Sequence, residues 1–211
     1  VGMMTRIEDW IQDTTRLLRG ESDFPLLEAE IILSFVINKP RAWIVSHPDS
    51  RLEEENLEHA NHLIGRLLKG EPLPYLTGIQ AFYGLDFSIT PDVLIPRPET
   101  ESLVEECIKW LEKRPSKRRM VDVGTGSGII AITLAKSFSD LAITAIDISE
   151  KALSVARNNA KKFHLEERVI FIHNNLLADH QVKYDLIAAN LPYIPQGILK
   201  DLKVSKFEPE L

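Results

Sequence analysis

The stretch Val121-Asp122-Val123-Gly124-Thr125-Gly126-Ser127-Gly128 decides the fold class of this chain. It ends a short apolar run and opens a helix that we expect over residues 128–137. Glycines at a strand-to-helix turn let the backbone bend sharply and approach a ligand closely, and the N–H groups at the helix start face that ligand. The turn therefore predicts an α/β fold with a small-molecule site beyond the carboxyl end of the strand.

Strands and helices alternate on both sides of this turn. Helices are expected over residues 99–113, 128–137 and 149–164, and strands over residues 119–123, 142–147, 169–173 and 184–190. Such alternation indicates a parallel sheet wound by right-handed crossovers. The predicted class is a Rossmann-like α/β fold.

The chain before residue 99 follows a different pattern. Residues 1–72 carry apolar residues at helical spacing and predict a small bundle of three amphipathic helices. Prolines punctuate residues 73–98, where segments 79–87 and 87–95 are expected to form a β-hairpin. We therefore expect a helical substrate-recognition domain (1–72), a hairpin linker (73–98) and a ligand-binding α/β domain (99–211).

The composition is that of an ordinary globular protein, with 44% hydrophobic and 27% charged residues. A net charge of −6 argues against non-specific attraction to nucleic acid, and we interpret the basic stretch 113–119 as a solvated loop. The single cysteine suits a reducing compartment. No apolar run approaches the roughly 20 residues that span a bilayer, and the start lacks a signal-peptide pattern. We expect a cytoplasmic protein without a membrane segment or a bound metal.

Asp147 lies 23 residues after Gly124, at the end of the next expected strand. A carboxylate at this place can accept hydrogen bonds from both ribose hydroxyls of a nucleoside ligand. A dinucleotide site also requires such an acid, but its fingerprint is G-x-G-x-x-G, whereas Gly128 makes the pattern here G-x-G-x-G. S-adenosylmethionine (AdoMet) carries no pyrophosphate and does not need a phosphate-cradling turn. The turn and the acid favour AdoMet over NAD.

A third contact with the cofactor is expected at the end of the third strand. Asn174 and Asn175 follow it, and a side-chain amide there can bind the amino group of adenine. Asparagines are also common turn formers, and the sequence leaves both interpretations open.

The fourth expected strand ends in Ala189-Asn190-Leu191-Pro192-Tyr193, beside the methyl donor. An amide NH2 is a poor nucleophile because its lone pair is delocalised into the carbonyl. The side-chain oxygen of Asn190 and the backbone carbonyl of Leu191 can each accept one N–H of a target amide, which orients it and favours the charge that develops on nitrogen. Pro192 would stiffen the loop, and Tyr193 would offer an aromatic face to the flat target.

These segments resemble the release-factor glutamine methyltransferases (the HemK/PrmC family), which transfer a methyl group from AdoMet to the glutamine side-chain amide of the Gly-Gly-Gln tripeptide of peptide chain release factors. The matching segments are Ile95-Pro96-Arg97-Pro98-Glu99-Thr100-Glu101, Asp122 to Gly128, Ala145-Ile146-Asp147-Ile148-Ser149, and Asp185 to Ile194. The Pro-Arg-Pro-Glu-Thr-Glu stretch is the most family-specific of them. Many AdoMet-dependent enzymes share the glycine turn.

The resemblance implies a role for each matching site residue. AdoMet would be held by Gly124, Thr125, Gly126, Ser127, Gly128, Asp147 and Asn190. The substrate glutamine would be held by Asn190, Leu191, Pro192 and Tyr193. The helical N-terminal domain would help to grip the release factor.

This chain departs from the family pattern in three places. Leu191 stands where the family usually has proline, and Asn175 where it usually has an acid. The chain also stops at Leu211, before about three strands that the family fold contains. We expect a chain of this length to expose the fourth strand as an open sheet edge, to self-associate and to show little activity.

Two alternative functions stay open, one of them another methyl transfer and the other from a different class. The first is methylation of an exocyclic amino group on a nucleic-acid base, which uses similar Asn-Pro-Pro-Tyr chemistry. The second is a non-catalytic module that binds AdoMet or a protein partner. The acidic net charge and the Pro-Arg-Pro-Glu-Thr-Glu stretch argue against the nucleic-acid substrate.

Overall fold

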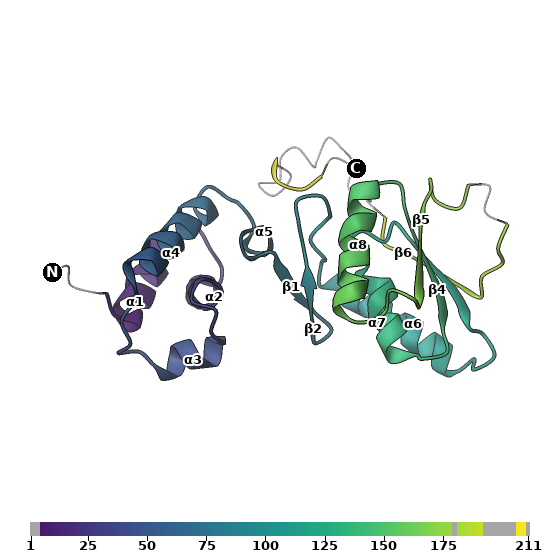
Figure 1. Ribbon diagram of the computed structural model, residues 1–211, viewed down its shortest axis with the longest axis horizontal. Helices are drawn as coiled ribbons and strands as arrows, with labels where there is room; N and C mark the ends of the chain where they lie inside the picture. Colours follow the sequence, from purple (N-terminus) through teal and green to yellow (C-terminus); the bar gives the residue numbers. More distant parts are fainter. Residues whose placement is uncertain (1–4, 179–180, 192–205, 210–211) are drawn as a thin grey trace. The chain divides into compact units, whose positions relative to one another are not determined.

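The computed structural model of the 211-residue chain describes residues 5–178, 181–191 and 206–209. The chain divides into two compact units, Val1–Thr77 and Gly78–Leu211. Figure 1 shows helices alone in the first unit, and strands together with helices in the second.

The first unit is helical, as predicted. Its elements are α1 (Ile7–Leu18), α2 (Pro25–Val36), α3 (Arg41–Ser46), α4 (Glu54–Leu67) and α5 (Leu73–Thr77). The α1 and α4 helices are amphipathic, whereas α2 is apolar on most of its surface. The expected bundle of three helices missed α3 and α5, which are 6 and 5 residues long and too short to show a helical period. Buried side chains from several helices form the core, among them Trp10, Leu33 and Leu63.

The second unit begins with a β-hairpin, in which β1 (Ile79–Phe82) pairs antiparallel with β2 (Leu85–Ser88). The predicted arms, 79–87 and 87–95, place the turn too late and are wrong. Tyr83 and Gly84 form the turn, with φ of 50° and 74°. A two-residue hairpin loop requires positive φ at both central residues, and glycine at the second is a strong signal for it.

The hairpin packs inside the second unit through Phe87, which is fully buried. Its ring centroid lies 5.1 Å from that of Phe163, just after α8 (Glu150–Lys162). Asn159 of α8 strengthens the contact, because its Oδ1 accepts the N–H of Ser88 at 2.7 Å and its Nδ2 donates to the Ser88 carbonyl at 2.9 Å. The hairpin is thereby fixed to the helix that follows the second strand of the main sheet.

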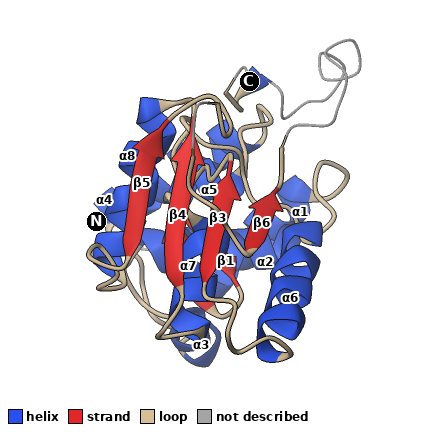
Figure 2. Cartoon of the chain, turned by 90° about the vertical axis from the view of Figure 1, so that its right-hand side faces the viewer, coloured by secondary structure: helices blue, strands red, loops and turns tan. Residues whose placement is uncertain are grey.

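The main sheet is parallel, as predicted, with the order β5-β4-β3-β6. Its strands are β3 (Arg119–Val123), β4 (Ala142–Asp147), β5 (Val169–His173) and β6 (Leu186–Ala189). Figure 2 shows the four arrows side by side and pointing the same way. The fourth strand, β6, is shorter than the predicted strand over residues 184–190. Just before it, the Asp185 carboxylate accepts the backbone N–H groups of Arg118 and Arg119, at 3.0 and 3.1 Å.

Three helices accompany the sheet, at the places the sequence predicts. They are α6 (Glu99–Glu112), α7 (Ile129–Ser137) and α8. Ser149 caps α8 by accepting the N–H of Ala152 at 3.2 Å. The α7 helix is buried from Ile129 to Ala135 and contacts β3, β4 and β5, and only its last turn is exposed.

The strand order of the main sheet reverses at β3. The chain runs from β3 to β4 and β5, and then returns to place β6 on the other side of β3. Ligands of open parallel sheets bind beyond the carboxyl ends of the strands at such a reversal. We therefore expect the site among the residues that follow β3 and β6.

Within the described part of the chain, no helix combines the length and apolar character needed to cross a membrane. The same residues contain no group of three or more His, Cys, Asp or Glu side chains arranged to hold a metal ion.

Candidate active site

The register of the sheet brings the predicted site residues to the carboxyl end of the strands. Val123 is aligned with Ile146 of β4 on one side and with Ala189 of β6 on the other. The residues that come next, Gly124 after β3 and Asn190 after β6, therefore leave the sheet at the same level. Two segments 66 positions apart in the sequence meet here.

The glycine turn is tied to the neighbouring strand by its backbone. The N–H groups of Gly124 and Thr125 both donate to the carbonyl of Ile146, at 2.8 and 2.9 Å. Gly124 and Gly126 have φ of 71° and 56°, a region that is costly for residues with a Cβ. The path of the turn therefore depends on glycine and on the register between β3 and β4.

Gly126 and Asp147 form the part of the turn that fits a ribose. The N–H of Gly126 donates to Asp147 Oδ2 at 2.8 Å, and the N–H of Ser149 donates to Oδ1 at 2.9 Å. A carboxylate offers about four acceptor positions, so about two remain for the hydroxyls of a ligand. Among the residues that the structure describes, none has an atom within 4 Å of a Cβ added to Gly126, so they leave space beside the turn. Both observations fit the nucleoside part of AdoMet.

Gly124 lies against the segment that follows β6. A Cβ placed on Gly124 would come within 2.6 Å of Leu191 Cδ2, closer than real Cβ atoms approach a neighbour. The side chain of Leu191 therefore lies over the first glycine of the turn. The residue that departs from the family pattern uses its side chain to join the two halves of the site.

The other members of the glycine turn face the protein interior. Thr125 and Ser127 are 5% and 3% exposed. The Ser127 carbonyl accepts Nδ2 of Asn159 at 2.9 Å, and a Cβ on Gly128 would lie 3.1 Å from Cβ of Ala156 in α8. These residues shape the turn and pack it against α8. That these residues contact the cofactor stays a prediction. Because their side chains are buried, such contacts would come from their backbone atoms.

Asp122 is a residue of this site that the sequence reasoning did not single out. It is fully buried, and its Oδ2 accepts the Thr125 hydroxyl at 2.7 Å and the N–H of Ala131 at 3.2 Å. Its Oδ1 is buried without a hydrogen-bond partner. Burial raises the pKa of Asp122 to about 6, against the lowering effect of the Thr125 hydrogen bond. The signal that could have revealed it is an acid inside an otherwise apolar strand.

Asn159 is the second residue that was missed. It is fully buried on α8 and bonds both the hairpin and the Ser127 carbonyl. The signal that could have revealed it is an asparagine on the apolar face of a predicted helix, where a buried amide needs several partners.

The two asparagines after β5 have different surroundings. Asn174 donates its backbone N–H to the Asp147 carbonyl at 3.0 Å, and its Nδ2 donates to the Ala178 carbonyl at 2.8 Å. Its Oδ1 accepts the N–H of Asn175 at 2.8 Å. The side chain of Asn174 is thus engaged in its own turn, whereas Asn175 is exposed. A contact between these amides and adenine stays a prediction, and Asn175 is the better placed of the two.

Asn190 stands at the end of β6 with its side chain held by a partner from α6. Its Nδ2 donates to Oγ1 of Thr100 at 3.0 Å. Thr100 belongs to the Pro-Arg-Pro-Glu-Thr-Glu stretch, and the sequence alone did not connect it with Asn190. The predicted contacts of Pro192 and Tyr193 lie outside the described residues.

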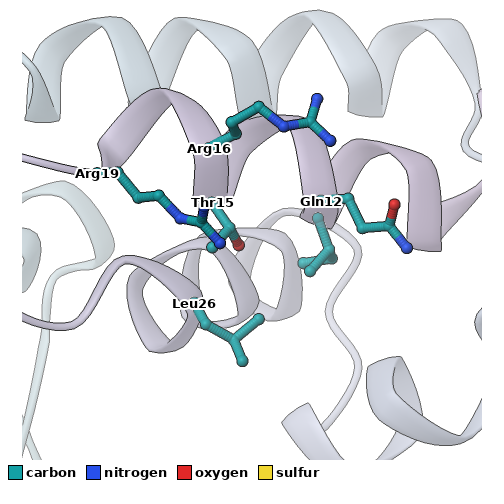
Figure 3. A pocket seen from close by; sticks show the side chains of 6 residues that line it. Gln12, Thr15, Arg16, Arg19 and Leu26 are labelled. Atoms are coloured by element: carbon teal, nitrogen blue, oxygen red, sulfur yellow. The ribbon is translucent and has the colours of Figure 1, made fainter.

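A hollow of about 310 Å³ lies in the first unit and is lined by side chains of α1 and α2. Figure 3 shows Gln12, Thr15, Arg16, Arg19 and Leu26 around it. None of the predicted site residues lines this hollow, so it is separate from the site at the sheet edge.

Comparison with known proteins defines the class of this chain. Residues 9–78 match the family model of the PrmC N-terminal domain, and residues 101–202 match that of the ribosomal protein L11 methyltransferase (PrmA). Among solved structures, the N-terminal domain of human METTL16 in complex with SAH is 23% identical, with 54% of this chain and 49% of that chain covered and a TM-score of 0.42. The parallel sheet, the glycine turn and the PrmA match define an AdoMet-dependent α/β methyltransferase.

Curated relatives identify the family. The release factor glutamine methyltransferase of Koribacter versatilis (strain Ellin345) is 41% identical, with 90% of this chain and 68% of the relative covered. The enzyme of the same name from Buchnera aphidicola subsp. Baizongia pistaciae is 37% identical, with 97% and 73% covered. The chain belongs to the release factor glutamine methyltransferase family, and the resemblance seen in the sequence is confirmed.

Proposed function

We propose that this chain methylates the side-chain amide nitrogen of the glutamine in the Gly-Gly-Gln tripeptide of peptide chain release factors, with AdoMet as methyl donor. The observation that carries the proposal is the shared register of β3, β4 and β6. This register brings two residues to the carboxyl end of the sheet. They are Asp147, whose carboxylate can accept ribose hydroxyls, and Asn190, whose side chain can bond an amide. Membership of the family supports the same substrate.

The cofactor half of the proposed site consists of the glycine turn and Asp147. Gly124 and Gly126 bring the backbone close to the ligand, and the remaining acceptor positions of Asp147 bind the ribose hydroxyls. Asn175 binds the adenine amino group. When bound, AdoMet supplies a methyl group that is electrophilic because it is carried on a sulfonium.

The substrate half consists of Asn190 and the residues after it. Asn190 Oδ1 accepts one N–H of the glutamine amide, and the backbone carbonyl of Leu191 accepts the other. These bonds orient the nitrogen and strengthen as it becomes pyramidal and gains positive charge, so they stabilise the transition state more than the bound substrate. The methylated nitrogen then loses a proton to water, and no general base is needed before the attack. Pro192 and Tyr193 complete the proposed contact by stiffening the segment and covering the flat amide.

The first unit is proposed to bind the body of the release factor. Large apolar side chains are exposed around the start of α2: Phe24, Leu26 and Leu27 are 66%, 50% and 36% exposed, and Leu26 lines the hollow of Figure 3. Exposed apolar groups in one place are typical of a protein-binding surface. A release factor acts in translation, so we propose a cytoplasmic location.

A parallel assay tests this function. Label from methyl-labelled AdoMet is followed onto a release factor, onto the same factor with the Gly-Gly-Gln glutamine changed to alanine, and onto tRNA and DNA. We expect label on the unchanged factor only. Label on a nucleic acid would establish the alternative substrate, and binding of AdoMet without transfer to any of them would establish a non-catalytic module.

A further inference from the structure

Thr100 lies opposite the side chain of Asn190, although 90 positions separate them in the sequence. Asn190 Nδ2 donates to Thr100 Oγ1 at 3.0 Å, and Thr100 is only 3% exposed. A hydrogen bond shielded from water is electrostatically stronger than an exposed one. The contact joins the Pro-Arg-Pro-Glu-Thr-Glu stretch to the residue that is proposed to bind the target amide.

The orientation of an asparagine amide decides what it can bind. One end of the amide is a donor and the other an acceptor, and the terminal torsion is broad and nearly two-fold when nothing restrains it. With Nδ2 held against Thr100, Oδ1 of Asn190 is left to accept a hydrogen bond. With the amide turned over, Nδ2 would meet the N–H of the target, and two donors facing each other form no bond.

We infer that Thr100 is a positioning residue for methyl transfer: its hydroxyl bonds one end of the Asn190 side-chain amide and holds the plane of that amide in place. Because a hydroxyl can both donate and accept, the target N–H, which needs an acceptor, selects the orientation in which Oδ1 faces it and Nδ2 faces Thr100. The kinetic consequence rests on the proposed function. The restraint on the amide is a property of the protein alone and is measurable without a substrate.

Contacts on both sides hold Thr100 in place. Its N–H donates to the carbonyl of Arg97 at 3.0 Å. The guanidinium of Arg97 donates to both carboxylate oxygens of Glu208, at 2.6 and 2.8 Å, and the Glu208 side chain is 5% exposed. Next to Thr100, the Glu101 carboxylate accepts the N–H of Tyr83 in the hairpin turn at 2.9 Å. A residue anchored in this way can transmit its position to a partner.

The kinetic test compares two substitutions of Thr100 with a matched control in the full chain. Thr100→Val keeps the shape and removes the hydroxyl, and Thr100→Ser keeps the hydroxyl. The control is Thr133→Val, because Thr133 is 1% exposed and its hydroxyl donates within α7 to the Ile129 carbonyl at 2.6 Å. We expect Thr100→Val to lower kcat for the release factor by about 10- to 100-fold, with KM and the AdoMet Kd within about twofold. Thr100→Ser should regain most of the lost rate, and Thr133→Val should keep it.

The structural test follows the side-chain amide of Asn190 in ¹H–¹⁵N NMR spectra. We expect Thr100→Val to shift both amide protons and to speed their exchange with water by about tenfold, while Thr100→Ser and Thr133→Val do neither. An unchanged Asn190 amide in Thr100→Val, or a Thr100→Ser enzyme as slow as Thr100→Val, would overturn the inference. Failure of the wild-type chain to methylate a release factor would instead reject the proposed function, and the NMR comparison would still decide the role of Thr100.

Discussion

The proposed cofactor half and the proposed substrate half of the site are built in different ways. In the cofactor half, the backbone N–H groups of Gly124 and Thr125 bond the Ile146 carbonyl, and that of Gly126 bonds Asp147. In the substrate half, Asn190 is held by the side chain of Thr100, from a helix 90 positions earlier in the chain. One half depends on strand register and glycine, and the other on side chains brought together by tertiary packing.

This difference predicts which substitutions disrupt each half of the site. A backbone turn tolerates changes at exposed side chains but fails when a Cβ is added at a glycine with positive φ. A site half that is built from side chains tolerates substitutions elsewhere that keep the backbone path, but it loses its function when one of its polar groups is removed. Leu191 belongs to both halves, because its side chain packs on Gly124 while its carbonyl is proposed to bind the substrate.

The largest effect is expected for Asn190→Ala. Removal of a preorganised group that acts in the transition state typically costs about 100- to 1,000-fold in kcat, and we expect a loss in this range on a release factor. The AdoMet Kd, measured by calorimetry, should change far less. A fall in turnover below tenfold, in a variant that still folds, would contradict the role given to Asn190.

The next largest effect is expected for Gly124→Ala. The new Cβ would adopt a φ of 71°, and this strain should cost about 1–3 kcal/mol of stability. The overlap with Leu191 adds less, because Cδ2 is the end of a flexible side chain that is 37% exposed and can move away. The double variant Gly124→Ala/Leu191→Ala removes the overlap but not the φ strain, so it should stay close to Gly124→Ala. Chemical denaturation of both variants measures this, and wild-type stability of Gly124→Ala would contradict the claim that the turn requires glycine.

Asp147→Ala should weaken AdoMet binding and also lower stability, because the N–H groups of Gly126 and Ser149 lose their acceptor. It removes the proposed acceptor for two ribose hydroxyls, and hydrogen bonds to a charged group contribute roughly 1.5–3 kcal/mol. Calorimetry with AdoMet on both proteins gives the answer. Unchanged affinity would refute the role of Asp147, and tight binding of NAD would overturn the assignment of the cofactor.

Asp122→Asn should stabilise the protein in a pH-dependent way. Burial raises the pKa of Asp122 to about 6, so folding disfavours the ionised form. The penalty is absent below the unfolded-state pKa of about 4 and fully present above pH 6, and removal of the charge should raise the free energy of unfolding there by about 1–3 kcal/mol. Urea unfolding of both proteins at pH 4 and pH 8 tests this. A gain that is equal at both pH values would show that the charge of Asp122 is not its cause.

The smallest effect is expected for Leu191→Pro, which restores the usual family residue. The backbone carbonyl that is proposed to act remains, and the proline ring replaces part of the side-chain contact with Gly124. We expect kcat within about threefold of the wild type, because the carbonyl that is proposed to act is kept and Leu191 is 37% exposed, so the smaller proline leaves little buried space empty. A loss comparable to that of Asn190→Ala would mean that the leucine side chain itself is needed.

The backbone of the proposed cofactor half could be predicted from the sequence, whereas the side-chain partners in the proposed substrate half could not, for a physical reason. Glycines, strand periodicity and an acid at the next strand end are local signals, and they located the turn, Asp147 and the four parallel strands. The hairpin turn was misplaced because the positive φ of Tyr83 was not anticipated. The partners of Asn190, Leu191 and Asn159 come from segments far away in the sequence, and their pairing depends on packing that no local pattern encodes.

The most direct test of the central claim identifies the atom that receives the methyl group. The chain is incubated with AdoMet and a release factor for a single turnover, and the peptide that contains Gly-Gly-Gln is fragmented by mass spectrometry. We expect one methyl group on the glutamine side-chain nitrogen with the wild type, and none over the same time with Asn190→Ala. A methyl group on another residue, or equal methylation of that nitrogen by both proteins, would contradict the claim that Asn190 positions a glutamine amide for methyl transfer.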